Sequence, residues 1–274
     1  MTLLIIIPTF QRPELLKSCL DSVCSQLALN VNVLVVDQSS NDASCVICEQ
    51  YSQVKYIHAD YQNKSKAINE GISKSNDDII SIIDDDTILD ENWVTAVFRA
   101  FGDSTIDIVQ GSILVSDNSF EDSVDNNQDI VSKRQIIGRV CFPPLFKIGC
   151  NFAFRRRVFD NTGSFNEKLG PGTKNKAGED LEWGYRVFKH GFKLLLNPEM
   201  RLTHTSWREK EDLQKQTEEY GRAFGKVLKV VRDYCFIDFL AYYIQYLIIG
   251  YIKSLIKGNR KGWFEAARKG YRES

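Results

Sequence analysis

The first hundred residues alternate between short apolar runs and segments whose apolar residues recur at helical spacing. A short run of aliphatic residues is typical of a buried strand, and apolar positions at a period near 3.6 are typical of an amphipathic helix. The runs that predict strands are 3–7, 31–36, 54–57, 79–83 and 106–109. The segments that predict helices are 13–27, the stretch after the polar turn 38–42, 65–73 and 91–101.

This alternation predicts an α/β fold with a mostly parallel sheet covered by helices on both faces, because the strand runs are apolar throughout. In open sheets of this kind, ligands bind beyond the carboxyl ends of the strands. Asp37 follows the second run, and three consecutive aspartates, residues 84–86, follow the fourth. Topology alone therefore predicts two acidic sites at one edge of the sheet.

Beyond residue 110 the pattern is less regular. Residues 116–129 are polar and acidic and predict a mobile surface loop, whose role is either solvation or that of a lid over an acceptor. Order returns near Ile136, and a glycine-rich, charged stretch covers 163–184. Apolar positions at helical spacing over 213–231 predict a further long helix.

Composition favours a globular protein. The 274 residues are 43% hydrophobic and 26% charged, and 35 basic residues against 36 acidic residues leave a net charge of −1. These values exclude a disordered tail, a collagen-like repeat and a polytopic membrane protein. A nucleic-acid binder usually carries a basic excess, so nucleic acid is not expected as a partner.

The seven cysteines form no regular framework, which indicates a reducing, cytoplasmic compartment. Cys45 and Cys48 make a lone C-x-x-C pair, and we interpret them as half-buried helix residues rather than as redox or zinc ligands. The first residues do not resemble a signal peptide, because the apolar run at 3–7 is short and leads directly into Pro8.

The aspartate triplet is the strongest chemical signal in the chain. Adjacent carboxylates repel one another, and such a cluster is costly unless a cation neutralises it. Carboxylate oxygens suit Mg²⁺ or Mn²⁺. The alternative is a solvated cap for the helix predicted at 91–101. Asp37 has two interpretations as well: a carboxylate that accepts from a base or ribose, or an ordinary turn-forming aspartate.

Asp180 and His204 are further candidates. Asp180 stands in Gly178-Glu179-Asp180, before a helical pattern. It is either a general base that takes a proton from a bound hydroxyl or a carboxylate favoured by the helix dipole. His204 is either a metal ligand or pH-sensitive contact, or a structural residue.

Several common catalytic motifs are absent from the sequence. It contains no G-x-x-x-x-G-K-[ST] loop, no complete G-x-G-x-x-G, no G-x-S-x-G and no H-E-x-x-H. Kinases, nicotinamide dehydrogenases, α/β-hydrolases and zinc proteases of these types are therefore disfavoured.

Six segments, taken in order, resemble the family 2 glycosyltransferases of the GT-A fold. The matching segments are Ile5 to Arg12 (I-I-I-P-T-F-Q-R), Val35 to Ser40 (V-V-D-Q-S-S), Lys64 to Gly71 (K-S-K-A-I-N-E-G), the triplet 84–86 at the D-x-D, Gly149 to Arg156 (G-C-N-F-A-F-R-R), and Gly163 to Glu167 followed by Gly178 to Asp180. The resemblance covers about residues 1–205. It implies a Rossmann-like sheet flanked by helices, with a C-terminal helical extension.

The resemblance also implies roles for individual residues. The residues implied at the nucleotide-diphosphate sugar are Pro8, Thr9, Arg12, Asp37, Lys66, Asp84 and Asp85, with Asp37 at the base and Asp84 at the ribose or sugar. Asp86, and His204 as a second contact, would hold Mn²⁺ or Mg²⁺. Asp180 would be the catalytic base of an inverting transfer, in which the metal stabilises the departing nucleoside diphosphate.

Two departures from the family pattern narrow the expectation. Ile68 stands where the family often has arginine, which weakens the prediction of diphosphate contacts at that helix. No Q-x-x-R-W motif follows residue 205, so transfer of a single sugar is expected rather than processive synthesis. The competing functions are a non-catalytic nucleotide-sugar-binding protein and a sugar nucleotidyltransferase, although the latter should carry a glycine-rich loop after the first strand.

The C-terminal segment has a distinct composition. Residues 239–252 are uncharged and rich in Tyr, Leu and Ile, and seven basic residues against Glu265 and Glu273 follow them. Fourteen residues are too few to span a bilayer, so we expect an interfacial helix on an anionic membrane. The alternative is a helix that covers the core or forms a dimer.

The sequence therefore predicts three regions: a catalytic domain at 1–205, a helical extension at 206–233 and a membrane-interfacial tail at 234–274. The expected partners are a nucleotide-diphosphate sugar, a glycan or lipid-linked acceptor in cell-surface polysaccharide synthesis, and the inner face of the cell membrane, on which a cytoplasmic protein would lie peripherally. The base, the sugar, the acceptor and the oligomeric state are left open.

Overall fold

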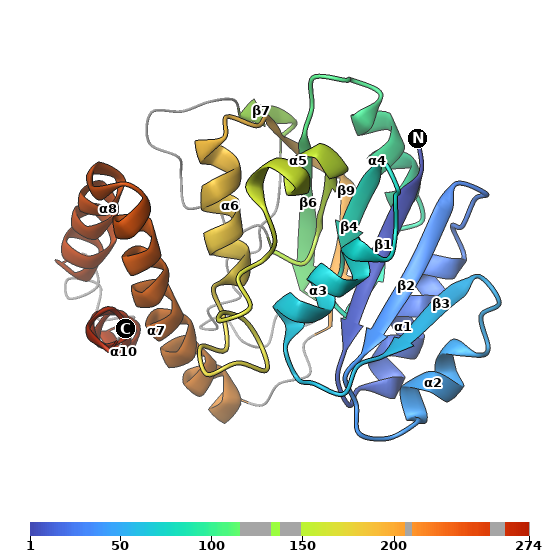
Figure 1. Cartoon of the computed structure of the whole chain (residues 1–274), viewed down its shortest axis with the longest axis horizontal. Coiled ribbons are helices and arrows are strands. Elements are labelled where there is room, and N and C mark those ends of the chain that lie inside the picture. The colour runs from blue at the N-terminus through green and yellow to red at the C-terminus, as the bar shows by residue number, and fades with distance from the viewer. Residues whose placement is uncertain (116–132, 138–148, 206–209, 253–260, 274) are drawn as a thin grey trace.

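A mixed β-sheet lies at the centre of the protein, with helices on both of its faces (Figure 1). The computed structural model describes residues 1–115, 133–137, 149–205, 210–252 and 261–273. Within them the strands are β1 (Leu3–Thr9), β2 (Val31–Asp37), β3 (Val54–His58), β4 (Ile79–Ile82), β5 (Thr87–Leu89), β6 (Ile108–Val115), β7 (Gln135–Ile137), β8 (Phe152–Arg155) and β9 (Leu194–His204). The loop predicted at 116–129 lies outside the described residues.

The first four predicted strands form the parallel part of the sheet, in the order β3-β2-β1-β4. All seven residues of β1 are buried, as expected for a strand covered on both faces. The register pairs Thr9 with Asp37, so β1 and β2 end side by side. The predicted α/β fold is confirmed, and Asp37 and the triplet lie at the same edge of the sheet.

Beyond β4 the strand directions alternate more than the sequence indicated. β8 is antiparallel to both of its neighbours, β4 and β6, whereas β6 and β9 are parallel. The register shifts between Gly111 and Ser112, where a Cβ on Gly111 would lie 1.8 Å from the carbonyl oxygen of Met200. Only glycine allows the two backbones to approach so closely.

Strand β5 was not predicted and determines the place of the triplet. The sequence offered residues 84–86 as a possible cap for the helix at 91–101, but that helix, α4, begins at Trp93. Residues 87–89 instead pair antiparallel with β9, and Thr87 lies opposite His204. The triplet therefore occupies a tight connection between β4 and β5. The sequence did not reveal β5, because a three-residue strand is too short to give a periodic signal.

Helices cover the sheet in two groups. They are α1 (Pro13–Cys24), α2 (Ala43–Cys48), α3 (Lys64–Ser73), α4 (Trp93–Phe101), α5 (Arg156–Thr162) and α6 (Glu179–Lys189). Apolar residues of α1, α2 and α4 form one core with one face of the sheet, and those of α3, α5 and α6 form a second core with the other face. Cys45 and Cys48 both lie in α2, as predicted, and Cys45 is half-buried, whereas Cys48 is buried.

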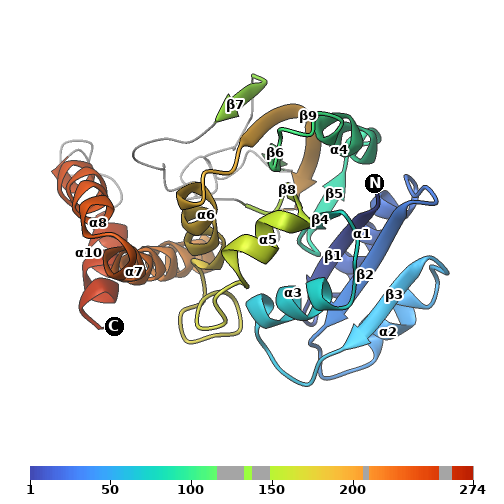
Figure 2. The ribbon, with the colours of Figure 1, turned by 45° about the horizontal axis from the view of Figure 1, so that its top comes forward.

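The C-terminal helices pack outside α6 as a further layer (Figure 2). They are α7 (Lys210–Tyr234), α8 (Phe236–Tyr242), the π-helical segment η2 (Tyr243–Ile249) and α10 (Lys261–Arg272). α7 and α10 touch through glycines: a Cβ on Gly225 would lie 2.0 Å from the carbonyl oxygen of Ala267, and one on Gly270 2.0 Å from that of Arg222. Part of the tail thus covers the protein core, which was one of the two predicted alternatives.

Candidate active site

The site lies at the edge of the sheet where β1, β2 and β4 end. The loop after β4 carries the triplet, in which Asp85 and Asp86 are buried and Asp84 is half-buried. Pro8 and Thr9 are buried at the end of β1, and the Thr9 hydroxyl donates a 2.7 Å hydrogen bond to Oδ2 of Asp85. The first strand therefore holds the middle aspartate in a fixed orientation.

Arg12 joins two of the three aspartates. It precedes α1, and its Nη1 lies 3.0 Å from Oδ1 of Asp85 and 3.1 Å from Oδ2 of Asp86. Burial raises the pKa of Asp85 to about 6, although the nearby Arg12 guanidinium opposes that rise. Arg12 was predicted at the nucleotide pocket, and its ion pairs with the triplet are a contact that the sequence analysis did not predict.

Lys64, the first residue of α3, pairs with the remaining aspartate. Its Nζ lies 2.5 Å from Oδ1 of Asp84. Burial lowers the pKa of Lys64, but the carboxylates of Asp84 and Glu179 outweigh it and raise that pKa overall. The chain itself therefore places two permanent cations, Arg12 and Lys64, among three carboxylates. The sequence argument assigned this neutralisation to a bound metal alone, because distant lysine and arginine contacts cannot be derived from spacing.

His204, the last residue of β9, contacts the third aspartate of the triplet. Its Nε2 lies 3.2 Å from Oδ1 of Asp86, because the β5–β9 register brings the end of β9 beside the triplet. Donor atoms of Asp84, Cys150 and His204 also lie within 4.8 Å of one another. Carboxylate, imidazole and thiol are all ligands of divalent cations. The residues present therefore fit a divalent metal ion.

A glycine-rich loop brings the start of α6 to the same edge. The loop between α5 and α6 is bound to α3: the Ser65 hydroxyl donates to the Leu169 carbonyl at 2.8 Å, and the Lys64 amide donates to the Pro171 carbonyl at 3.0 Å. Gly172 has φ of 83°, and a Cβ there would lie 2.4 Å from the Gln62 carbonyl oxygen. These contacts place α6 so that Glu179 faces Lys64 and Asp84.

Glu179 and Asp180 begin α6 in different surroundings. Asp180 is half-buried, and its Oδ1 accepts a hydrogen bond from the Leu181 amide at 2.7 Å. Glu179 is buried, and burial, with the charge of Asp180, raises its pKa to about 7 against the opposing effect of Lys64. Sequence reasoning selected Asp180 and missed the environment of Glu179, since two adjacent acids give no sign of which one is buried.

Two predicted residues make other contacts. Asp37 is fully buried and accepts hydrogen bonds from the Tyr56 hydroxyl and the Ser39 amide, each at 2.9 Å. The turn-forming interpretation of Asp37 is therefore observed, and its contact with a base stays a prediction. Lys66 lies on the exposed side of α3, with its Nζ 3.9 Å from the centre of the Tyr61 ring. Lys64, which sequence reasoning quoted but did not select, occupies the place beside the triplet.

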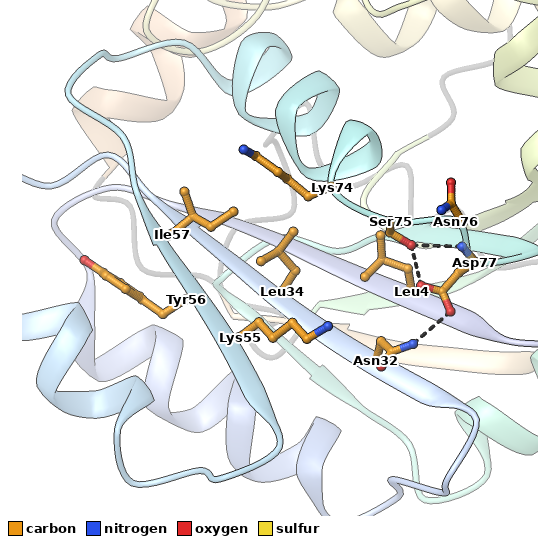
Figure 3. A pocket seen from close by; sticks show the side chains of 10 residues that line it. All are labelled: Leu4, Asn32, Leu34, Lys55, Tyr56, Ile57, Lys74, Ser75, Asn76 and Asp77. Carbon is orange, nitrogen blue, oxygen red and sulfur yellow. Dashed lines mark hydrogen bonds between the residues drawn. The ribbon is translucent and has the colours of Figure 1, made fainter.

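A pocket at the opposite edge of the sheet contains none of the predicted site residues (Figure 3). It lies between β2, β3 and the end of α3, with Lys55 and Lys74 at its border. Asp77 there accepts hydrogen bonds from Asn32, at 2.8 Å, and from Ser75. Asn32, Ser75 and Asp77 thus bind one another, and we assign this pocket no ligand.

The fold is that of the GT-A glycosyltransferases. A structure of residues 1–349 of S. aureus TarS in complex with UDP-GlcNAc superposes with a TM-score of 0.68 at 15% identity, over 97% of this chain and 79% of the TarS fragment. The mannosyltransferase PcManGT from Pyrobaculum calidifontis, in complex with GDP-Man and Mn²⁺, gives a TM-score of 0.67 at 14% identity, over 98% and 86% of the two chains. At such identities these likenesses concern the fold alone.

The sequence comparison defines the family. The model described as "Glycosyl transferase family 2" matches residues 4–163, and the chain belongs to this family. It is 26% identical to glycosyltransferase GlyG of Streptococcus pneumoniae over 120 residues, which are 42% of this chain and 40% of GlyG. It is 22% identical to the O-antigen chain rhamnosyltransferase RfbN of Salmonella typhimurium over 226 residues, 78% of this chain and 70% of RfbN. The chain thus spans less than half of GlyG.

Proposed function

We propose that this protein transfers one sugar from a nucleotide-diphosphate sugar to a hydroxyl group of a glycan or lipid-linked acceptor, with inversion at the anomeric carbon. The observation that carries the proposal is the convergence of Arg12, Lys64, His204 and the aspartates 84–86 at one edge of a family 2 sheet. A site with fixed cations and carboxylates is suited to a diphosphate that gathers charge as it leaves.

The donor would lie across the carboxyl ends of β1, β2 and β4. Pro8, Thr9 and Asp37 would line the part of the pocket that holds the nucleotide base. Arg12 and Lys64 would supply the positive charges for the diphosphate. Asp86 and His204 would hold Mn²⁺ or Mg²⁺, which supplies a Lewis acid for the departing diphosphate when bound. The neighbour PcManGT, whose structure contains GDP-Man and Mn²⁺, supports this type of donor complex.

Asp180 would be the general base that takes the proton from the acceptor hydroxyl. It is half-buried at the first turn of α6, so a bound acceptor can reach it, whereas Glu179 beside it is buried against Lys64. A carboxylate within hydrogen-bond distance of a bound hydroxyl group can take its proton as the hydroxyl attacks the sugar. The regions predicted at 1–205, 206–233 and 234–274 would serve as catalytic domain, extension and tail.

A turnover assay separates this function from its two competitors. Incubation with UDP- and GDP-sugars, Mn²⁺ and a panel of sugar acceptors should release nucleoside diphosphate and yield a glycosylated product. Release of pyrophosphate from a nucleoside triphosphate and a sugar phosphate would indicate a nucleotidyltransferase instead. Donor binding without any turnover, unchanged by Asp180→Asn, would indicate a non-catalytic binding protein.

We further propose that the tail rests on an anionic membrane surface. Asp238 of α8 is 3% exposed and faces α6, where it accepts from the Tyr185 hydroxyl at 2.8 Å and pairs with Lys189 at 2.9 Å. The opposite side of α8 and η2 exposes large apolar side chains. They are Phe236, Ile237, Leu240, Ile244, Ile248, Ile249 and Ile252, here called the apolar stripe.

The apolar stripe has the character of an interfacial surface. No helix among the described residues is long and apolar enough to cross a bilayer. The stripe contains no charged residue, and the next charges along the chain, from Lys253 onward, are mainly basic. An apolar face bordered by lysine and arginine is the pattern that binds headgroups of anionic lipids. A peripheral position on the inner face of the cell membrane would then bring the site to lipid-linked acceptors.

A further inference from the structure

We propose that the thiol of Cys150 is a further ligand of the divalent cation at this site, together with Asp84 and in addition to Asp86 and His204. The site would then bind thiophilic cations such as Co²⁺, Zn²⁺ and Cd²⁺ more tightly than Mg²⁺. This inference rests on the donor site of the proposed function but concerns the metal alone. The sequence resemblance implied only Asp86 and His204 as metal contacts, and Cys150 entered it merely as one letter of a strand motif.

The first support is geometric. One ligand atom from each of Asp84, Cys150 and His204 lies within 4.8 Å of the other two. Bonds of about 2.0–2.3 Å to one ion require donors closer together than this limit, so small rotations of the three side chains would bring them onto a single ion. All three residues are half-buried, so an ion can enter from solvent and still keep protein ligands on one side.

The second support is the rigidity of the backbone beside the thiol. Asn151, the next residue, is fully buried, and its Nδ2 donates to the carbonyl oxygens of Ser112 at 2.8 Å and Met200 at 2.9 Å. Its Oδ1 accepts from the indole of Trp93 at 2.8 Å. Asn151 is therefore fixed at both ends of its amide, and it holds Cys150 at the edge of the sheet. Metal sites need donors that are held in this way.

The third support is charge. Three carboxylates at the edge face two permanent cations, Arg12 and Lys64, which leaves negative charge for a further cation. Cysteine binds a metal ion as the thiolate, and binding of the ion releases the proton of the thiol. Soft thiolate ligands shift preference from Mg²⁺ toward later transition metals.

Another thiol near the triplet has the opposite properties. Cys19 is fully buried, and its Sγ lies 3.7 Å from the carbonyl oxygen of Asp84. Burial, reinforced by the charge of Asp85, raises the pKa of Cys19 well above its ordinary value. A thiol that stays protonated in the core does not bind metal. Cys150 is therefore the cysteine to test.

Cobalt spectroscopy tests this inference without any turnover. The full-length protein is titrated with Co²⁺, and a thiolate-to-cobalt charge-transfer band in the near ultraviolet is expected. Cys45→Ser, on the distant helix α2, is the matched control and should keep the band. Cys150→Ser should lose it and should lower the affinity for Cd²⁺ by about 10-fold or more, because loss even of a residue that only supports a ligand costs that much, with little change for Mg²⁺. Cys150→Ala is the second variant, and circular dichroism checks that each variant folds.

The outcomes distinguish this inference from the proposed function. Bound Co²⁺ without a charge-transfer band, or a band that survives in both Cys150 variants, overturns the role of the thiol. Sugar transfer with Mn²⁺ in that case leaves the proposed function intact. A cysteine-dependent band in a protein that transfers no sugar supports the thiol ligand and contradicts the proposed function.

Discussion

The imidazole Nε2 of His204 lies 3.2 Å from Oδ1 of Asp86. One residue follows a parallel strand of the N-terminal half, and the other ends β9 far along the chain. The short strand β5 joins them, because its antiparallel register sets Thr87 opposite His204. The family resemblance implied that both residues contact the metal ion, and in the structure their side chains contact each other.

Substitution of Asp180 tests the assignment of the base. Asp180→Asn should lower kcat about 10²- to 10⁴-fold, because it removes proton transfer in the transition state. The Kd of the Asp180→Asn variant for the nucleoside diphosphate, measured by calorimetry, should stay within about twofold of the wild-type value. Glu179→Gln is the neighbouring control and should retain measurable turnover. A Glu179→Gln protein without turnover beside an active Asp180→Asn protein would assign the base to Glu179.

The raised pKa of Glu179 predicts a pH-dependent stability. Its pKa is about 7 in the folded protein against an ordinary 4.5, so the folded state binds the proton more tightly than the unfolded chain. Burial of the charged carboxylate, together with the nearby Asp180, makes ionisation of Glu179 destabilise the fold as the pH rises from about 4.5 through about 7, and Lys64 offsets only part of this.

Glu179→Gln should accordingly raise Tm by a few degrees at pH 8, and the gain should shrink toward pH 5. Thermal unfolding in metal-free buffer across this pH range is the measurement. The nearby Glu167→Gln substitution, on an exposed side chain, is the control and should change Tm little at any pH. A gain from Glu179→Gln that is constant with pH would mean that altered hydrogen bonds, and not ionisation, explain it.

The contact between Asp238 and α6 predicts how the tail is anchored. Asp238→Ala leaves the Tyr185 hydroxyl and the Lys189 ammonium without this buried partner, so the free energy of unfolding should fall by about 2–4 kcal/mol. Urea denaturation gives that value. Asp233→Ala, on an exposed carboxylate of α7, should cost less than about 1 kcal/mol. Equal losses in the two variants would show that Asp238 does not anchor α8.

The apolar stripe predicts binding to anionic vesicles. The wild-type protein should sediment with vesicles of phosphatidylglycerol and phosphatidylcholine but not with phosphatidylcholine alone. Ile237→Ser, Ile244→Ser and Ile248→Ser combined should reduce the bound fraction about tenfold or more, because each removes buried apolar area at the interface. The control carries Leu29→Ser and Val46→Ser, two exposed apolar positions of the catalytic domain.

Two results would contradict the membrane proposal. Equal sedimentation of the stripe variant and the control would remove the stripe from the interface. The wild-type protein could instead fail to sediment with vesicles and form a dimer that dissociates when the stripe is substituted. That result would show that this surface binds a second copy of the chain.

The fold was largely predictable because each parallel strand is a short apolar run that ends at a polar residue. Val33 to Val36 followed by Asp37 is such a run, and it is observed as β2 with Asp37 as its last residue. The strands β5 and β7 have only three residues each, and their pairing with β9 depends on tertiary contacts. No local pattern in the sequence carries that information.

The aspartate triplet and two of the residues that contact it could be predicted from the sequence. The triplet, Arg12 and His204 come from motifs in the sequence, and the structure brings them together. Lys64 and Cys150 were not selected, because their approach to Asp84 depends on where α3 begins and on how Asn151 is held. The choice of Lys66 over Lys64 shows the limit of motif spacing: the two residues lie on different sides of one helix turn, and only Lys64 points to the triplet.

Binding of nucleoside diphosphates is the most direct test of the donor site. Thermal unfolding is measured with UDP, GDP, ADP, CDP and dTDP, each with and without Mn²⁺, for wild type and Asp86→Ala. One diphosphate should raise the wild-type Tm only when Mn²⁺ is present, because a ligand that binds the folded state stabilises it by mass action. Asp86→Ala should abolish that shift while it remains folded. If no diphosphate shifts the wild-type Tm in either condition, or if Asp86→Ala shifts as wild type does, the aspartate triplet is not the donor site.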